Sequence, residues 1–325
     1  MRLLTVLGLT VVQCCFISAV CPAKPALTSV GPQPIIIDTD IGSDIDDAFA
    51  IALALQSPEL KIVGITTVSG DTVARAKIVD QMLGVTGHQD IPVAAGAPTV
   101  LSNGAPPIGR QRRFGDNGSF ARPDHVSAVD FILQKIRESP DQITLVAIGP
   151  LTNLGAAIEK DPEAFRRVKR VVLMGGWIKP GRWGGMTYSV APEYNIQLDP
   201  VAAQRLFRSG VPIFVMPLDS TGDLLLDEVK RDVLLTAGTP LSNSLGTLFL
   251  MWSGSTPAWS YSTPILYDVM AVAFVLDPKL CPVQPMNIVV DERGLTRAET
   301  GQATAQVCLS SDAGRFFDFF MARFH

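Results

Sequence analysis

The sequence is poor in the side chains that carry zinc and thiol chemistry. Only three histidines occur in 325 residues, and three of the five cysteines lie within the first 21 residues. The other two, Cys281 and Cys308, have neither the spacing of a zinc site nor the neighbours of a catalytic thiol. They could form a disulfide in an oxidising compartment, and two buried free thiols are an equally good interpretation. Zinc- and cysteine-based catalysis are therefore disfavoured.

An excess of positive charge and a second long apolar run are also missing. The net charge is −4 and the pI is about 5.4, which argues against a nucleic-acid-binding surface. Beyond the N-terminal segment, no apolar stretch is long and uninterrupted enough to span a bilayer.

The N-terminal segment has the pattern of a secretory signal peptide. A basic residue, Arg2, precedes an apolar run over residues 3–20, and small residues follow near residue 23. We therefore expect residues 1–23 to be cleaved and the mature chain to be secreted or periplasmic. The alternative is an N-terminal membrane anchor, because the run approaches the length of a bilayer span. Residues 24–34 form a Pro-rich linker in this interpretation, and residues 35–325 form a single catalytic domain.

Five aspartates crowd into one short segment, between three isoleucines typical of a buried strand and an Ala-rich helix start. They are Asp38, Asp40, Asp44, Asp46 and Asp47, with no Lys or Arg among them. A helix N-terminus favours a nearby carboxylate by only about 0.3–1 kcal/mol, although one or two of the five could be simple helix caps. A hard divalent cation would hold the cluster together, and all-oxygen ligands suit Ca²⁺ or Mg²⁺.

Two other acidic motifs can be compared with this segment. An EF-hand loop starting at Asp38 would need Gly and Glu where Ser43 and Phe49 stand, so that motif is excluded. A phosphatase of the haloacid dehalogenase type also has two aspartates two apart after a strand. It does not explain the Asp46-Asp47-Ala48 triplet.

Strand and helix patterns alternate along the rest of the chain. This predicts an α/β fold with an open, mainly parallel (mixed) sheet flanked by helices. Ligands bind such sheets at the carboxyl ends of the strands. The residues that follow or end a strand, or lie in a loop that could reach one, are Asp40, Asp71, Ile148, Glu193 and Asp268.

The DTDIGSDIDDA segment resembles the N-terminal signature of the inosine-uridine preferring nucleoside hydrolase family, Asp-x-Asp-x-Gly followed by Asp-Asp-Ala. Three later matches fall in the family's order: ITLVAIGPLTNL at residues 143–154, Glu193-x-Asn195, and Tyr267-Asp268 before an Ala-rich helix. Two positions depart from the family pattern. Asp71 stands where the family usually has Asn, and Tyr267 stands where its best-known members have His.

The resemblance implies a Rossmann-type nucleoside hydrolase core and a role for each matched residue. It implies a Ca²⁺ site made by Asp40, Asp47, the carbonyl of Ile148 and Asp268. Asp40 would also be the general base, and Tyr267 would act at the leaving base. The implied substrate-binding residues are Asp46, Asp71, Met174, Glu193 and Asn195. Asp71 could equally be a plain helix cap, Met174 a core residue, and Asn153 is expected to cap its helix.

Aromatic side chains that could stack on a base are Trp177, Trp183, Tyr188 and Tyr194. The implied activity is hydrolysis of ribonucleosides to free base and ribose, in purine or pyrimidine salvage, by a homodimer or homotetramer. Two alternatives remain open. One is a metal-dependent phosphatase, weakened by the lack of a suitably placed Lys. The other is a secreted nucleoside- or sugar-binding protein without turnover, which Asp71 and Tyr267 make credible.

Overall fold

A mixed, mainly parallel sheet forms the centre of the fold. The structure is a computed structural model that describes residues 31–98, 108–254 and 263–324. Within these ranges, ten strands form one sheet: β1 (Gln33–Thr39), β2 (Leu60–Thr67), β3 (Val93–Ala95), β4 (Val126–Ser127), β5 (Thr144–Ala147), β6 (Arg170–Met174), β9 (Ile213–Met216), β10 (Val283–Val290), β11 (Thr296–Glu299) and β12 (Ala305–Cys308).

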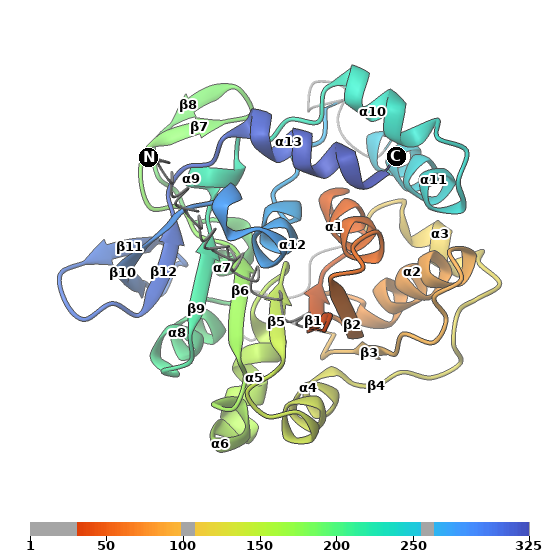
Figure 1. The fold of residues 1–325 in the computed structure, drawn as a ribbon. Coiled ribbons are helices and arrows are strands. Elements are labelled where there is room, and N and C mark those ends of the chain that lie inside the picture. The colour runs from red at the N-terminus through yellow and green to blue at the C-terminus, as the bar shows by residue number, and fades with distance from the viewer. Residues whose placement is uncertain (1–30, 99–107, 255–262, 325) are drawn as a thin grey trace, which may run out of the picture. The chain divides into compact units, whose positions relative to one another are not determined.

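The order of these strands is β11-β10-β12-β9-β6-β5-β1-β2-β3-β4 (Figure 1). The strands from β12 to β4 in this order pair in parallel, whereas β10 pairs antiparallel with both β11 and β12. The predicted fold class is therefore confirmed. The expected signal peptide lies outside the described residues, and the last two residues assigned to the linker, Gln33 and Pro34, belong to β1.

Helices cover both faces of the sheet, and each face has its own apolar core. The helices on one face are α1 (Asp46–Leu55), α2 (Thr72–Val85), α10 (Glu228–Leu235), α11 (Pro240–Ser253), α12 (Val269–Leu276) and α13 (Ala313–Met321). Those on the other are α4 (Ala128–Glu138), α5 (Thr152–Lys160), α6 (Pro162–Phe165) and α8 (Pro200–Arg208). Shorter elements are α3 (Arg112–Asp116), α7 (Tyr194–Leu198), α9 (Leu218–Thr221), the 3₁₀ turns η1 (Pro278–Leu280) and η2 (Ala322–Phe324), and the hairpin β7 (Gly181–Trp183) and β8 (Met186–Tyr188).

The three isoleucines of β1 show why the central strands are apolar without interruption. Side chains alternate between the faces of a strand. Ile35 and Ile37 accordingly pack into the core beneath α1 and α12, whereas Ile36 packs into the core beneath α4 and α5. A parallel strand covered on both sides therefore needs apolar residues at every position.

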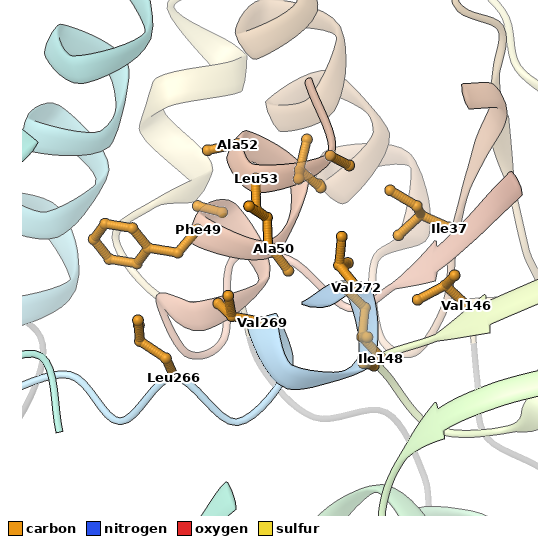
Figure 2. Close-up of a cluster of buried hydrophobic side chains, with 14 of the residues drawn as sticks. Ile37, Phe49, Ala50, Ala52, Leu53, Val146, Ile148, Leu266, Val269 and Val272 are labelled. Atoms are coloured by element: carbon orange, nitrogen blue, oxygen red, sulfur yellow. The ribbon is translucent and has the colours of Figure 1, made fainter. Parts of the chain in front are cut away.

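Two helices that carry acidic residues at their N-termini, α1 and α12, pack directly on each other. Figure 2 shows their side chains meeting above the ends of β1 and β5. The labelled residues of this cluster are Ile37, Phe49, Ala50, Ala52, Leu53, Val146, Ile148, Leu266, Val269 and Val272. Alanines on α1 leave room for close helix approach. The packing therefore fixes the start of α1 beside the start of α12.

A disulfide joins Cys281, just after η1, to Cys308 at the end of β12, with 5.6 Å between the Cα atoms. Of the two interpretations of these cysteines, the disulfide is thus confirmed and the pair of free thiols is wrong. Among the described residues, none of the helices combines the length and the apolar character that a bilayer span requires.

Candidate active site

The site lies where the direction of strand order reverses, at the carboxyl ends of β1 and β5. From β1 the chain adds β2, β3 and β4 on one side, whereas β5, β6 and β9 follow on the other. Ligands bind open α/β sheets at such a reversal. A cavity of about 600 Å³ opens here, and its lining includes Asp40, Asp44, Asp46, Asp47, Ile148, Met174, Trp177, Trp183, Glu193, Tyr194, Asn195, Trp252, Tyr267 and Asp268.

Three carboxylates at the helix junction form a group that could hold a metal ion. One oxygen each of Asp46, Asp47 and Asp268 lies within 4.8 Å of the others. All three side chains are buried. The backbone N–H of Asp268 donates to Oδ2 of Asp46 over 3.2 Å, which links the start of α12 to the start of α1.

The electrostatics of this group favour a cation. Burial raises the pKa of Asp46, Asp47 and Asp268 well above the usual range, and the neighbouring carboxylates raise the pKa values further. Buried like charges must either hold protons or be neutralised by a positive charge. A donor set made only of carboxylate oxygens fits a hard divalent cation.

Asp40 and Ile148 line the same cavity beside this group. Asp40 comes directly after β1, and Ile148 directly after β5. The next residue, Gly149, leaves room for the acid, because a Cβ there would lie 3.0 Å from Oδ1 of Asp40. The structure therefore brings all four predicted cation ligands to one cavity, together with Asp46.

A buried arginine that the sequence analysis missed supports the acidic segment from α2. Arg75 is fully buried. Its guanidinium donates to the carbonyl oxygens of Ser69, Asp40 and Ile41, the last over 2.9 Å, and to Oγ of Ser43 over 2.9 Å. Its charge lowers the pKa of Asp40, although burial raises that pKa more. Arginines on helices are usually exposed, so nothing in the sequence set this one apart.

Asp38 lies behind the cavity and takes part in a buried hydrogen-bond network. Its Oδ1 accepts hydrogen bonds from Oγ1 of Thr66 over 2.5 Å and from Nδ2 of Asn153 over 2.7 Å. The prediction that Asn153 caps its helix is wrong. The N-cap of α5 is Leu151, and the amide of Asn153 instead ties Asp38 to the carbonyl of Thr67 over 3.0 Å. Burial raises the pKa of Asp38 to about 7.

Glu193 and Asn195 enter the cavity from the start of α7. Glu193 caps this helix and accepts backbone N–H groups of Gly176 (2.9 Å), Asn195 (2.9 Å) and Ile196 (3.2 Å). Burial raises its pKa to about 7. The side-chain amide of Asn195 lies 3.3 Å from the carbonyl oxygen of Met174. Three of the five predicted substrate-binding residues, Met174, Glu193 and Asn195, therefore lie together in the cavity lining.

Asp71 lies at the start of α2, away from the cavity lining. One carboxylate oxygen accepts the N–H of Ala74 over 3.0 Å and so caps α2, and the other pairs with Arg112 over 2.9 Å. Asp71 is not among the described residues that line the cavity. Its position therefore corresponds to the helix-cap interpretation of this residue.

Aromatic rings form one wall of the cavity. Trp177, Trp183 and Tyr194 line it, whereas Tyr188 packs against Trp183 with 5.5 Å between ring centroids. The indole N–H of Trp183 donates to Oη of Tyr267 over 2.6 Å.

Two further lining residues were not assigned a role from the sequence. Trp252 reaches the cavity from the end of α11 and hydrogen-bonds to Asp44. Asp44 also accepts the N–H of Ile45 over 2.7 Å, and burial raises its pKa to about 6. A Trp at the end of an apolar helix is indistinguishable from a core residue in sequence.

An α/β sheet with a buried carboxylate group that could hold a cation, beside a polar and aromatic cavity at the strand-order reversal, is typical of enzymes that act on small polar ligands. The sequence matches the inosine-uridine preferring nucleoside hydrolase family over residues 35–318. The chain therefore belongs to this family, and it is a nucleoside hydrolase.

Individual relatives agree with this assignment. The pyrimidine-specific ribonucleoside hydrolase RihA of Citrobacter koseri is 33% identical over 274 residues, which is 80% of this chain and 85% of that protein. The plant nucleoside hydrolase PpNRh1 superposes with a TM-score of 0.79 at 26% identity, over 90% of this chain and 99% of that one. A purine-preferring ribonucleoside hydrolase from Gardnerella vaginalis gives a TM-score of 0.77 at 30% identity, over 90% and 98% of the two chains.

Proposed function

We propose that this enzyme hydrolyses ribonucleosides with Ca²⁺ held by Asp40, Asp47, Asp268 and the carbonyl of Ile148. The observation that carries the proposal is the meeting of buried carboxylates from α1 and α12 in one cavity. When bound, Ca²⁺ would supply the positive charge that orients a water molecule and the 2′- and 3′-hydroxyls of ribose. Asp46 lies in the same carboxylate group, so it can serve both the cation and a ribose hydroxyl.

The protein's own carboxylates perform the proton chemistry in this proposal. Asp40 takes a proton from the attacking water as the general base. Cleavage of the bond between C1′ and the base builds positive charge on the sugar ring, as in other glycoside hydrolysis. The carboxylates around the cavity stabilise that charge.

Glu193, Asn195 and Asp46 hold the ribose hydroxyls, with Met174 packing against the sugar. Glu193 already accepts three backbone N–H groups, which fix its carboxylate in place before substrate arrives. Fixed groups of this kind contribute to catalysis because no reorganisation is needed during the reaction.

Tyr267 acts at the leaving base, at the position where the best-known family members have His. It lines the cavity next to Asp268. The relatives include a pyrimidine-specific and a purine-preferring enzyme, so the base specificity of this chain has to be measured with both kinds of substrate.

We also propose that the chain is exported. The apolar N-terminal segment supports this proposal. So does the disulfide between Cys281 and Cys308, because structural disulfides are typical of oxidising compartments.

The test is ribose release from inosine, uridine, adenosine and cytidine, with Ca²⁺ and with a chelator. We expect release to require the metal and to fall at least about 10²-fold in Asp40→Asn, the scale of general base catalysis. The matched control is Asp116→Asn. Asp116 forms an exposed ion pair with Arg112 on α3, so we expect no change in ribose release.

Other outcomes would distinguish the alternatives. Nucleoside binding without ribose release would favour the binding-protein hypothesis. Phosphate release from phosphate esters without ribose release would favour the phosphatase, an alternative that family membership already disfavours. Full activity in chelator would contradict the calcium requirement but not the proposed hydrolysis.

A further inference from the structure

The β7–β8 hairpin lies beside α9 (Figure 1), and its residue Trp183 lines the cavity. Its two turn residues, Gly184 and Gly185, both have positive φ values, of 57° and 84°, as a tight two-residue hairpin requires. Asp223 accepts hydrogen bonds from Nε of Arg182 and from the N–H of Gly185, each over 2.8 Å. The N–H of Gly184 donates to the carbonyl of Gly222 over 2.8 Å. The hairpin is therefore fixed to the segment that follows α9.

This attachment places the last residue of β7, Trp183, against Tyr267. The indole ring is in edge contact with Trp177, with 5.9 Å between centroids, and in tilted contact with Tyr188 at 5.5 Å. Its Nε1 lies 2.6 Å from Oη of Tyr267. Trp183 and Tyr267 come from segments 84 residues apart, and both line the cavity that contains Asp268.

The direction of this hydrogen bond is fixed by chemistry. An indole N–H can only donate, whereas a phenolic oxygen can donate and accept. Oη of Tyr267 is therefore the acceptor, and its own hydrogen must point away from the indole.

We propose that Trp183 is a positioning residue that holds the Tyr267 hydroxyl as a proton donor to the departing base. This inference rests on the proposed hydrolysis and adds the device for leaving-group activation. As the bond between C1′ and the base nitrogen breaks, its electron pair stays on the base, and the Tyr267 hydroxyl gives its proton to the base. The phenolate left on Tyr267 accepts the indole N–H until it regains a proton from water.

Substrates that differ only in the leaving group test this role. Nucleosides need a proton on the departing base, whereas 4-nitrophenyl β-D-ribofuranoside releases a stable phenolate without one. We would measure kcat and KM for uridine, inosine and this riboside with the mature, calcium-loaded enzyme. The variants are Tyr267→Phe, Trp183→Phe and the double variant.

We expect Tyr267→Phe to lower kcat for the nucleosides about 10²-fold, because general acid catalysis contributes roughly 10²–10⁴-fold. Trp183→Phe keeps an aromatic ring and removes the N–H donor, so we expect a loss of about tenfold, typical of one hydrogen bond. The double variant should lose no more than Tyr267→Phe alone, since Trp183 acts through Tyr267. All three should cleave the nitrophenyl riboside at the wild-type rate, which also shows that the ribose site is intact.

The matched control is Met186→Leu, an exposed substitution on the same hairpin, which should leave both substrate types unchanged. Equal losses on nucleosides and on the riboside in Trp183→Phe would overturn the inference in favour of a structural role. Unchanged nucleoside turnover in Trp183→Phe, or multiplicative losses in the double variant, would also overturn it. A wild-type enzyme that cleaves the riboside but no nucleoside would overturn the proposed function instead.

Discussion

Single residues explain how five aspartates coexist within ten positions of the chain. Asp38 is turned away into a network with Thr66 and Asn153, so its side chain is not part of the cavity lining. The other four line the cavity. Arg75 donates hydrogen bonds to their loop, and its side chain is the only fully buried arginine among the described residues. A calcium ion on one side and the Arg75 guanidinium on the other would together offset three of the five negative charges.

Arg75 provides the first prediction at this scale. Arg75→Lys keeps the charge but cannot bond the carbonyls of Ser69, Asp40 and Ile41 together with Ser43. We expect calcium affinity to fall about 10–100-fold, as for other groups that orient metal ligands. Calorimetric titration with Ca²⁺ measures this loss. If the positive charge alone mattered, Arg75→Lys would bind calcium normally and only Arg75→Met would differ.

Some site residues could be identified from their neighbours in the sequence, whereas others have roles that depend on residues far away in the chain. The five aspartates are visible because they lie within ten positions of the chain and have no Lys or Arg among them. Asn153 and Arg75 owe their roles to partners 115 and 35 residues away, which no local pattern reveals. A helix-start Asn normally caps, but here the carboxylate of Asp38 competes for its amide.

At the scale of elements, the parallel strands were predictable because burial on both faces makes them apolar throughout. The β7–β8 hairpin was not, since each of its strands is three residues long and largely exposed. Its two glycines mark the turn, yet its position is fixed by contacts with Asp223, Gly222 and Tyr267, which are far away in sequence.

The disulfide provides a prediction about elements. It fastens the turn between η1 and β10 to the end of β12, near the antiparallel edge of the sheet. It closes a loop of 27 residues, for which chain entropy predicts a stabilisation of about 3.5 kcal/mol. Reduction should lower the free energy of unfolding by roughly this amount in denaturant titrations. A non-reduced digest should contain a peptide linked through Cys281 and Cys308, and two alkylated thiols there would refute the bond.

For the whole molecule, the site is assembled from segments that lie far apart in sequence. The parallel sheet brings their strand ends to one edge, and the packing of α1 on α12 brings together acids 222 residues apart. Such an assembly stores unfavourable charge in the folded, metal-free chain. Its stability must therefore depend on pH and on the cation together.

The sign of this pH dependence follows from the raised pKa values. Burial raises the pKa of Asp44 to about 6 and those of Asp38 and Glu193 to about 7. These carboxyls keep protons in the folded state that the unfolded chain releases near pH 4 (roughly the reference values). Their contribution to stability therefore falls as the pH rises from about 4 to about 7. In exposed ion pairs such as Asp141 with Arg167, the hydrogen bond from the arginine lowers the pKa of the aspartate. These pairs therefore change the stability only below about pH 4.

We accordingly expect the chelated protein to be less stable at pH 8 than at pH 6. Calcium binding displaces protons from the acidic group, so its affinity rises with pH. The increase in melting temperature on adding Ca²⁺ should thus be larger at pH 8 than at pH 6. Thermal melts in Ca²⁺ and in chelator at both pH values measure this, and equal increases would mean that the acids are already ionised without the metal.

The central claim is that a calcium ion held by the carboxylates of α1 and α12 is required for ribonucleoside hydrolysis. The most direct test measures bound calcium by mass spectrometry and ribose release on the same samples during stepwise removal of the metal. The account predicts that activity falls in proportion to occupancy, from full activity at one calcium per chain, and returns when Ca²⁺ is added back. Ribose release that persists after the bound calcium is gone would contradict it.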